Sequence, residues 1–371
     1  MHDPKQQDAA SLALHDICLT ASSGPFSLEV KPYEHLTVLS DDAAIMDRLT
    51  DIIMGQIAVP AGRILISEIE CTHFPPDQRA VGALDRRDGL LNHLSIYDNI
   101  ALPLRARREK PAAIRERIGR IGALLGFDPH THLRPDASDD EMQFRARFGR
   151  LLAYAPDVLI LNRPFEGLSD EARARCAKSV MMLQRALNLT ILHLTRLRDE
   201  AFFGSGRIAV LRGGTLQQCA DAPTLMDRPA SPHVARIFGH ANLMTGYVVR
   251  NIDDVAEIRL PCGTMVSAQS SDEVEQDHLC TLCVGPEKIA LSLTGAQLDE
   301  EDQAPLEAVI QDIRHNGDHI HLRCKLSDGT EVDIRRMPMQ YSASIQPGQK
   351  VYLAWIAGNA RAFPYDEPGE G

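Results

Sequence analysis

Short apolar runs alternate with longer amphipathic stretches over the first two-thirds of the chain. Five runs have the length of buried strands, and they cover residues 26–30, 36–39, 158–161, 190–194 and 208–211. Three stretches repeat apolar residues at helical spacing, and they cover residues 45–54, 111–126 and 170–187. Strands that alternate with helices imply crossover connections and a sheet covered on both faces. This pattern predicts an α/β domain.

The hydrophobic period changes near residue 240. Residues 320–326 alternate between apolar and polar side chains, Asp328 and Gly329 supply a turn, and the alternation resumes over 330–334. A further short strand is predicted over 351–355. We therefore expect a smaller all-β domain, either a barrel or a sandwich. The predicted boundary gives an α/β domain over 1–238 and a β domain over 239–371.

The composition is that of a soluble globular protein. Of the 371 residues, 44% are hydrophobic and 24% are charged, and the formal net charge is −12. This acidic balance argues against nucleic acid as a partner, because a phosphate-facing surface needs an excess of Lys and Arg. No apolar run reaches the roughly 18 residues of a membrane span, and Met1–Ala10 has no signal-peptide core. These features predict a cytosolic protein.

Two of the eight cysteines, Cys280 and Cys283, have the CxxC spacing of a metal or redox site. A zinc site needs four ligands, and no second pair stands at a matching distance. The favoured interpretation is a half-buried strand in which both cysteines act as small hydrophobic residues. We therefore predict free thiols throughout the chain and no metal site.

Five segments resemble one family of bacterial proteins. They read VKPYE at 30–34, FPPDQRAVG at 74–82, LLNHLSIYDNIALPLR at 90–105, APDVLILNRPFEGLSD at 155–170 and DRPASPHVARIFGHANLM at 227–244. Together they are similar to the ATP-binding subunits of bacterial ABC importers, in the polyamine, iron and sugar branch that carries a C-terminal TOBE-type β domain. The resemblance runs almost without gaps from Phe26 onward.

This resemblance implies an ABC-type P-loop ATPase-like domain followed by a small all-β domain of the OB or TOBE type. In the family, two such subunits form a head-to-tail dimer below membrane permease subunits and bind two MgATP between them. The implied partners are therefore a second cassette subunit and a permease, and the implied location is peripheral, on the inner face of the cell membrane. The Pro164–Phe165 pair favours a polyamine as the transported solute.

The segment that matches the family's phosphate-binding loop lacks the residues that phosphate chemistry requires. Such a loop needs glycines so that backbone N–H groups can wrap the phosphates, a Lys for the β and γ oxygens, and a hydroxyl for Mg²⁺. The matching positions, with Met46 in place of the Lys and Asp47 in place of the hydroxyl residue, are Ser40, Asp41, Asp42, Ala43, Met46, Asp47 and Arg48. Like charges about 4 Å apart repel by about 4 kcal/mol at an effective dielectric of about 20. We expect this loop to reject phosphate.

The positions that would carry out hydrolysis are replaced as well. Asn162 stands where a working ATPase places an Asp near Mg²⁺, and Arg163 follows where a Glu polarises the attacking water. A guanidinium accepts no proton at physiological pH, so Arg163 cannot be the general base. Arg196 occupies the position of the family's switch His, and Arg86 that of the Gln between metal and permease. We expect no catalytic residue and no bound cofactor.

The segment that matches the family's glycine-rich signature has become acidic. It consists of Ser138, Asp139, Asp140, Glu141 and Met142. The signature works because a Ser, backbone N–H groups and a helix N-terminus meet the γ-phosphate of the partner subunit's ATP, and three carboxylates cancel this attraction. The alternative interpretation is a solvated helix cap that the helix dipole favours. For Met46 the alternative is a helix residue that faces the core.

The replaced residues carry complementary charges. In the resembled fold, three carboxylates and four guanidiniums converge on one cleft, and they belong to Asp41, Asp42, Asp47, Arg48, Arg86, Arg163 and Arg196. We hypothesise that carboxylate–guanidinium pairs fill the space of the nucleotide and Mg²⁺. The rival hypothesis is that the arginines bind a regulatory anion.

These features favour a non-catalytic, pseudo-ATPase cassette subunit that docks on a permease near Arg86 and pairs with another cassette subunit. One alternative is a weakly active ABC ATPase that energises solute import, although the groups for positioning and charge stabilisation are missing. A third function is that of a soluble regulator in which the β domain senses a small ligand.

Overall fold

The computed structural model describes residues 10–87, 89–128, 132–204, 206–271, 273–294, 305–338 and 345–365. Backbone contacts divide the chain into two compact units, Met1–Ala222 and Pro223–Gly371. The boundary predicted at 238/239 falls at the end of the helix α8 (Pro232–Gly239), which these contacts assign to the second unit.

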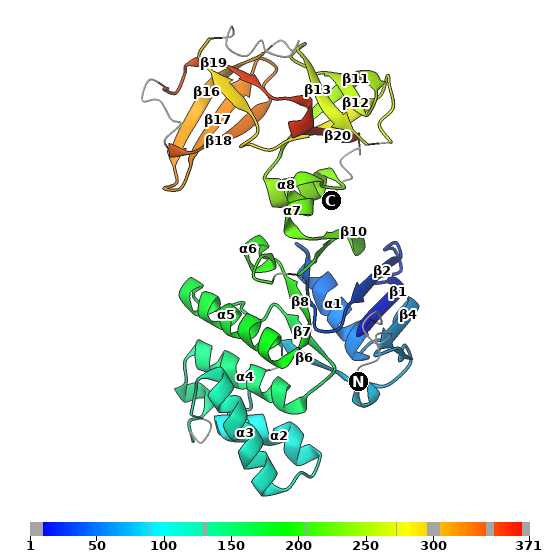
Figure 1. Cartoon of the computed structure of the whole chain (residues 1–371), viewed down its shortest axis with the longest axis vertical. Coiled ribbons are helices and arrows are strands. Elements are labelled where there is room, and N and C mark those ends of the chain that lie inside the picture. Colours follow the sequence, from blue (N-terminus) through cyan, green and yellow to red (C-terminus); the bar gives the residue numbers. More distant parts are fainter. Residues whose placement is uncertain are drawn as a thin grey trace. The chain divides into compact units, whose positions relative to one another are not determined.

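The first unit is built on a six-stranded sheet with the order β10-β9-β3-β8-β7-β6 (Figure 1). Its strands are β6 (Val81–Asp85), β7 (Val158–Asn162), β8 (Thr190–Thr195), β3 (His35–Leu39), β9 (Ile208–Arg212) and β10 (Thr215–Ala220). Neighbouring strands are parallel except β9 and β10, which form an antiparallel pair. Four of the predicted apolar runs form β3, β7, β8 and β9, and the central strands are buried along their whole length.

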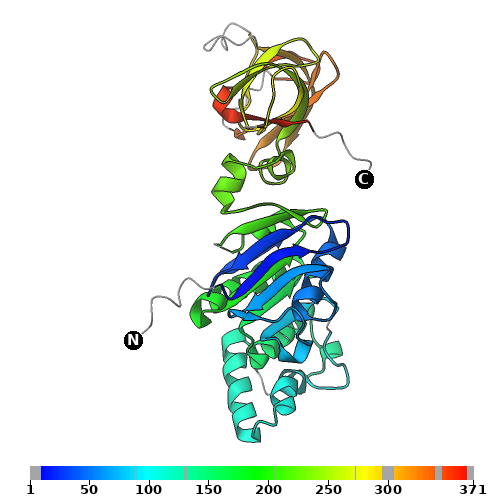
Figure 2. The ribbon, with the colours of Figure 1, turned by 90° about the vertical axis from the view of Figure 1, so that its right-hand side faces the viewer.

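The predicted run over 26–30 belongs instead to a second, antiparallel sheet with the order β2-β1-β4-β5. This sheet consists of β1 (Leu12–Cys18), β2 (Phe26–Val30), β4 (Ala61–Ile66) and β5 (Ile69–Glu70). Every second side chain of β2 is buried, because one face of this sheet packs on the core. Its inner side chains share that core with the helix α1 (Ala43–Met54) and with strands of the larger sheet. Figure 2 shows the blue strands of this sheet beside the larger one.

Helices pack on the larger sheet and extend the first unit at one end. Besides α1 they are α2 (Ile96–Ala106), α3 (Pro111–Leu125), α4 (Asp140–Tyr154), α5 (Asp170–Leu187) and α6 (Arg198–Ala201). Figure 1 shows α2, α3 and α4 gathered into one bundle, whose core includes Ile100, Phe144 and Phe148. The predicted helices are confirmed as α1, α3 and α5. Among the described residues, no helix has the length and apolar character to cross a membrane.

In the second unit, the strands follow the short helices α7 (Ala222–Asp227) and α8. Five strands close into a barrel, visible as a ring in Figure 2, and they are β11 (Asn242–Ile252), β12 (Val255–Arg259), β13 (Met265–Ser270), β20 (Ala360–Pro364) and β14 (Leu279–Val284). A second sheet contains β15 (Ala290–Ser292), β19 (Lys350–Ala354), β16 (Leu306–His315), β17 (Ile320–Leu326) and β18 (Glu331–Arg336). The predicted hairpin is β17 and β18, and the strand predicted over 351–355 is β19.

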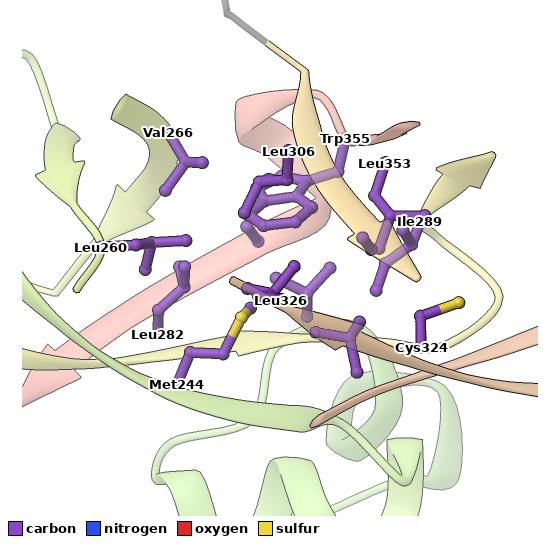
Figure 3. Close-up of a cluster of buried hydrophobic side chains, with 14 of the residues drawn as sticks. Met244, Leu260, Val266, Leu282, Ile289, Leu306, Cys324, Leu326, Leu353 and Trp355 are labelled. Carbon is purple, nitrogen blue, oxygen red and sulfur yellow. The ribbon is translucent and has the colours of Figure 1, made fainter. Parts of the chain in front are cut away.

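The barrel and the second sheet of this unit share one hydrophobic core (Figure 3). Met244 and Leu282 of the barrel contribute to it together with Leu353 of the second sheet. The buried ring of Trp355 belongs to the same core, and its indole N–H donates to the carbonyl of Ser267 at 3.2 Å. An α/β unit followed by an all-β region of strands confirms the predicted fold class.

Cys280 and Cys283 lie on β14 and point to opposite faces of the strand, because three positions along a strand reverse the side-chain direction. Cys280 belongs to the main core, and Cys283 packs with Ala235 and Phe363. Burial raises the pKa of Cys280 to about 11 and that of Cys283 to about 12. All eight cysteines are free thiols, as predicted, and this pair is buried rather than half-buried.

Candidate functional site

The loop between β3 and α1 supplies a carboxylate that caps the N-terminus of this helix. Asp42 is the N-cap of α1, and its side chain accepts the backbone N–H groups of Ala44 at 2.8 Å and Ile45 at 3.3 Å. These N–H groups are the donors that a phosphate at a helix N-terminus would use. Asp42 therefore occupies the anion position at the start of α1.

Met46 and Asp47 point in different directions from the first turns of α1. Met46 is fully buried in the core between the two sheets, as the core-facing interpretation predicts. Asp47 faces the end of β7, where its Oδ1 accepts Asn162 Nδ2 at 2.8 Å and Arg163 Nη2 at 2.5 Å. The structure thus brings together Asp47, Asn162 and Arg163, three of the replaced positions.

Arg163 has an uncommon backbone conformation directly after β7. Its φ of 48° lies in the left-handed region, which residues other than glycine rarely adopt. From there the guanidinium pairs with Asp47 and lies 3.5 Å from a carboxylate oxygen of Glu166. Its Nε is buried without a hydrogen-bond acceptor among the described residues. A cation held between two carboxylates has no capacity to accept a proton.

Asp85 and Arg87, which the sequence did not single out, complete a polar network in which Asp85 and Asn162 are buried and Arg87 is exposed. Asp85 ends β6 and lies beside Asn162 in the parallel register of β6 and β7. Its carboxylate accepts Asn162 Nδ2 at 2.9 Å and Arg87 Nη2 at 2.8 Å, and the same guanidinium reaches Asp51 on α1 at 2.6 Å. Burial alone would raise the pKa of Asp85, but the hydrogen bonds from Arg87 and Asn162 outweigh it and lower this pKa. β6 and β7 each end in a polar residue, Asp85 and Asn162, after apolar residues. This shared pattern is the sequence signal that could have predicted their contact.

The other arginines of the predicted cluster have different partners. Arg86 is exposed on the turn after β6 and pairs with Glu166 at 3.2 Å. Arg48 donates its Nε to the backbone carbonyl of Leu19. Within the described residues, neither forms an ion pair with the three aspartates of the loop. The expected ion pair between a loop carboxylate and an arginine is present for Asp47 and Arg163. Arg48 and Arg86 were expected to form such pairs too, but they contact other groups.

A cavity of about 350 Å³ lies beside this network. Three guanidiniums and three carboxylates line it, and they belong to Arg163, Arg173, Arg196, Asp41, Glu166 and Glu200. Arg173 and Glu200 were not predicted from the sequence. The carboxylate of Glu200 lies 3.4 Å from Arg173 Nε and accepts the Thr195 hydroxyl at 2.5 Å, and burial raises the pKa of Glu200. Arg196 is exposed, and it forms no ion pair in the part of the chain that the structure describes.

A buried histidine pair lies behind this cavity. His35 Nε2 of β3 and His193 Nδ1 of β8 are 3.5 Å apart, and His193 Nε2 is 3.9 Å from Glu200 Oε2. Burial lowers the pKa of His35 to about 4. Burial, together with the neighbouring His35, lowers the pKa of His193 well below its ordinary value. Both rings are therefore neutral at physiological pH.

The acidic segment 138–142 forms the start of α4. Asp139 caps the helix by accepting a backbone N–H at 2.7 Å, and Asp140 lies in the first turn. Glu141 accepts Arg175 of α5 at 2.7 Å, and this hydrogen bond lowers the pKa of Glu141. The helix-cap interpretation therefore describes the local structure of this segment.

A larger groove, of about 470 Å³, has walls from β6, α2 and α4. Apolar and aromatic side chains such as Val81, Pro103 and Tyr154 line it together with Arg147 and Arg150. Burial lowers the pKa of Arg147, and the charge of Arg150 acts in the same direction. The groove is therefore an apolar surface with cationic groups. In the described residues, no cluster of three or more His, Cys, Asp or Glu side chains is arranged to hold a metal ion.

Comparisons with known proteins agree with this architecture. The family model of the TOBE domain matches residues 282–363, in the second unit. The molybdate/tungstate import ATP-binding protein WtpC of Thermococcus kodakarensis is 30% identical over 221 residues, which cover 59% of this chain and 67% of that protein. The chain belongs to the family of ABC importer ATP-binding subunits.

Other members of this ABC importer family align over most of the chain. The putative 2-aminoethylphosphonate import ATP-binding protein PhnT of Salmonella typhimurium is 25% identical over 335 residues, which cover 89% of each chain. The spermidine/putrescine import ATP-binding protein PotA of Protochlamydia amoebophila is 23% identical over 349 residues, or 94% of this chain and 91% of that one.

Two solved structures show the same fold. The dimeric structure of the bacterial ABC transporter cassette MJ0796 matches with a TM-score of 0.50 and 17% identity, over 57% of this chain and 98% of that one. The structure of cbiO1 from Clostridium perfringens, part of the ABC transporter complex cbiONQ, matches with a TM-score of 0.53 and 18% identity, over 58% and 90%.

Proposed function

We propose that this chain is a non-catalytic subunit of an ABC importer, which keeps the cassette fold but neither binds nor hydrolyses MgATP. The observation that carries the proposal is the self-occupied loop, in which Asp42 takes the N–H donors of α1 and Asp47 engages Asn162 and Arg163. A bound triphosphate would have to displace the carboxylates of Asp42 and Asp47, or lie close to them and be repelled by their negative charge. Met46, at the position of the Lys, is buried in the core and supplies no donor.

The same residues do not fit a Mg²⁺ ion that bridges phosphates. Mg²⁺ takes oxygen ligands in octahedral geometry. Asn162 directs its amide nitrogen at both Asp47 and Asp85, and Arg163 places a permanent positive charge beside Asp47. Both features oppose the entry of a second cation into this space.

Titration calorimetry of the purified protein with MgATP, paired with a phosphate-release assay, tests this function. We expect neither heat of binding nor turnover. Micromolar binding of MgATP, with turnover that co-elutes with the chain in size-exclusion chromatography, would instead establish the weakly active ATPase. Turnover in fractions that lack the chain would identify a contaminating ATPase.

We also propose that the groove lined by Arg147 and Arg150 receives a cytoplasmic loop of a permease, which would place the protein on the inner face of the cell membrane. Its mixture of apolar surface and guanidinium groups favours a loop that carries apolar and acidic side chains. The proposed assembly also contains a second cassette subunit.

A pull-down from native membranes tests the groove. We expect a detergent-stable permease complex that Arg150→Glu disrupts and that the matched variant Arg120→Glu, on the exposed surface of α3, preserves. If the wild-type chain captures no permease, the soluble-regulator function gains support. Polyamine as the solute stays a prediction, because relatives named for aminoethylphosphonate and for molybdate or tungstate are similar over comparable lengths.

A further inference from the structure

The segment that joins α2 to α3 gathers positive charge in an otherwise acidic chain. Residues 105–120 contain seven Lys or Arg residues and two acidic residues, whereas the whole chain has a formal net charge of −12. The arginines at the two ends of this segment are paired, Arg105 with Asp98 and Arg120 with Glu116. The excess of positive charge therefore lies between them.

Four cations of this segment are exposed and form no ion pair with any carboxylate of the described residues. They belong to Arg107, Arg108, Lys110 and Arg115, and we call them the basic α2–α3 surface. Glu109 is the acid among them, and the first turn of α3 adds no other. Lys110 and Arg115 are five positions apart, a rise of about 7.5 Å, within the screening length of about 10 Å at about 0.1 M salt. The four cations therefore act together on a charged partner.

The fold fixes this segment on the helical bundle. α2 and α3 pack against each other (Figure 1), and Leu104 and Ile114 are buried in the core of the bundle. The Arg108 N–H donates to the carbonyl of Arg105 at 2.9 Å, and the Glu109 N–H donates to the carbonyl of Leu104 at 3.1 Å. The apolar side chains thus hold the turn in place, and the cations occupy its exposed side.

The basic α2–α3 surface borders the groove that we propose receives a permease loop. The Arg107 guanidinium lies 4.8 Å from the centre of the Tyr154 ring, and Tyr154 and Pro103 both line that groove. A permease loop that enters the groove emerges from the bilayer, so a surface beside the groove lies close to the lipid headgroups. This step rests on the proposed docking of the groove.

The composition of this surface favours a bilayer over a nucleic acid as the anionic partner. Residues 98–126 contain no aromatic residue that could stack on a base, and Arg107 covers a face of the Tyr154 ring. The acidic remainder of the chain would repel a long polyanion that extends beyond the basic surface. A charged plane meets one surface of the protein at a time, so a local excess of cations is sufficient.

We propose that the basic α2–α3 surface binds the anionic phospholipid headgroups of the cytoplasmic leaflet directly, without permease or nucleotide. The guanidinium and ammonium groups attract the lipid phosphates. Because the chain as a whole is acidic, this contact also orients the protein, with its negatively charged remainder turned away from the bilayer. Direct lipid binding goes beyond the proposed docking on a permease, to which it adds a second contact.

Co-sedimentation of the full chain with phospholipid vesicles tests this contact. One set of vesicles contains phosphatidylcholine and phosphatidylglycerol in equal parts, and the other contains phosphatidylcholine alone. We expect binding to the anionic vesicles only. Binding should decrease as NaCl rises from about 0.1 M to about 1 M, because the screening length falls from about 10 Å to about 3 Å. Binding to neither set, or equally to both, overturns the proposal.

Two sets of substitutions in the basic α2–α3 surface separate charge from geometry. Arg108→Glu/Lys110→Glu/Arg115→Glu should weaken binding to the anionic vesicles at least about tenfold. Arg108→Lys/Lys110→Arg/Arg115→Lys keeps every charge and exchanges the shapes of the cationic groups, so it should bind as the wild type does. Loss of binding in this second variant would contradict recognition by a charged plane.

A matched variant controls for net charge. Lys31→Glu/Arg63→Glu/Arg212→Glu makes the same change of charge at exposed positions on or next to strands of the two sheets. Its binding should stay within about twofold of the wild type, because these positions lie outside the helical bundle. Equal losses in the two glutamate variants would mean that net charge rather than this surface decides binding. Circular dichroism melts confirm that each variant is folded.

Two competitors identify the source of the anion. Inorganic phosphate, added at constant ionic strength, should not displace the protein from the vesicles. Displacement would indicate a site for free phosphate and overturn the proposal. A single-stranded RNA that binds as tightly as the anionic vesicles, and that the glutamate variant of the basic surface no longer binds, would overturn it in favour of a nucleic acid.

The vesicle experiment and the pull-down fail independently. Vesicles contain no permease, so binding to them stands even if the wild-type chain captures no permease from native membranes. A captured permease without vesicle binding overturns the lipid contact alone and leaves the proposed docking of the groove intact.

Discussion

At the scale of single residues, buried polar groups hold the site together more than exposed charges do. Asp85 is 2% exposed and lies between Arg87 and Asn162. The Glu116–Arg120 pair on α3, by contrast, is open to water. An exposed pair contributes at most about 1 kcal/mol, whereas removal of a buried partner leaves other polar groups unsatisfied.

Asp85→Ala is therefore expected to lower the free energy of unfolding of the first unit by about 2 to 3 kcal/mol. The substitution removes the buried partner of Arg87 and one acceptor of the Asn162 amide. Urea unfolding followed by far-ultraviolet circular dichroism measures the change, because α1 to α6 lie in the first unit.

Two controls accompany this variant. Glu116→Ala, which breaks the exposed pair, should change the free energy of unfolding by no more than about 0.5 kcal/mol. Trp355 is the single tryptophan and lies in the second unit, so its emission should keep the same urea midpoint. If Asp85→Ala and Glu116→Ala lowered the free energy of unfolding by the same amount, the burial of Asp85 would not be what makes its contacts stabilising.

At the scale of elements, the N-terminus of α1 decides what the loop can hold. A helix start leaves N–H groups unsatisfied, and any carboxylate or phosphate in reach accepts them. Asp42 is built into the loop and meets those donors without loss of translational freedom. The element is thus stable with its own cap, and an external phosphate has to compete with a covalently tethered acceptor.

Asp42→Ala should destabilise the first unit by about 1 kcal/mol, the usual effect of losing an Asp N-cap. Asp41→Ala is the matched control, because Asp41 is an exposed neighbour that caps nothing among the described residues. Thermal and urea unfolding compare the two variants. If both lose the same stability, the cap is not what stabilises the start of α1.

The sequence predicted elements well where the hydrophobic period is regular. α3 buries Ile114, Ile118 and Ile121 on one face, as its spacing indicated. α2 was not predicted, and Pro103 interrupts its helical signal. The antiparallel pairing of β1 and β4 was also missed, since the first half of β4, Ala61 to Arg63, contains no apolar run. Such strands are stabilised by their neighbours rather than by their own composition.

At the scale of the whole molecule, the two units have separate cores, and the histidine pair belongs to the first. His35 has a folded pKa of about 4 against an ordinary value of 6.5, because it is buried. Between these pH values the unfolded chain binds more protons at this position than the folded chain does. The free energy of unfolding therefore falls as pH decreases through this window, and His193 acts in the same direction.

We expect the His35 contribution to cost the first unit about 2 kcal/mol between pH 7 and about pH 5. His35→Gln removes the titrating ring, so its urea midpoint should depend less on pH over this range than that of the wild type. Taking the difference between the two proteins cancels the contribution of Glu200, whose pKa is raised by burial. His278→Gln, which changes an exposed histidine, should keep the wild-type dependence. Parallel pH profiles for all three proteins would refute the assignment.

The sequence by itself determined the α/β and all-β architecture, and it placed at Met46, Asn162 and Arg163 the side chains on which the proposed loss of ATPase chemistry rests. These conclusions depend on apolar periodicity and on which functional groups a side chain carries, and both are properties of the chain alone. Only the tertiary structure decided which charges meet. Asp47 and Arg163 are 116 residues apart and Arg87 and Asp51 are 36 apart. An ion pair or a hydrogen bond depends on distance and burial in space, and the register of β6 and β7 sets these for the hydrogen bond between Asp85 and Asn162.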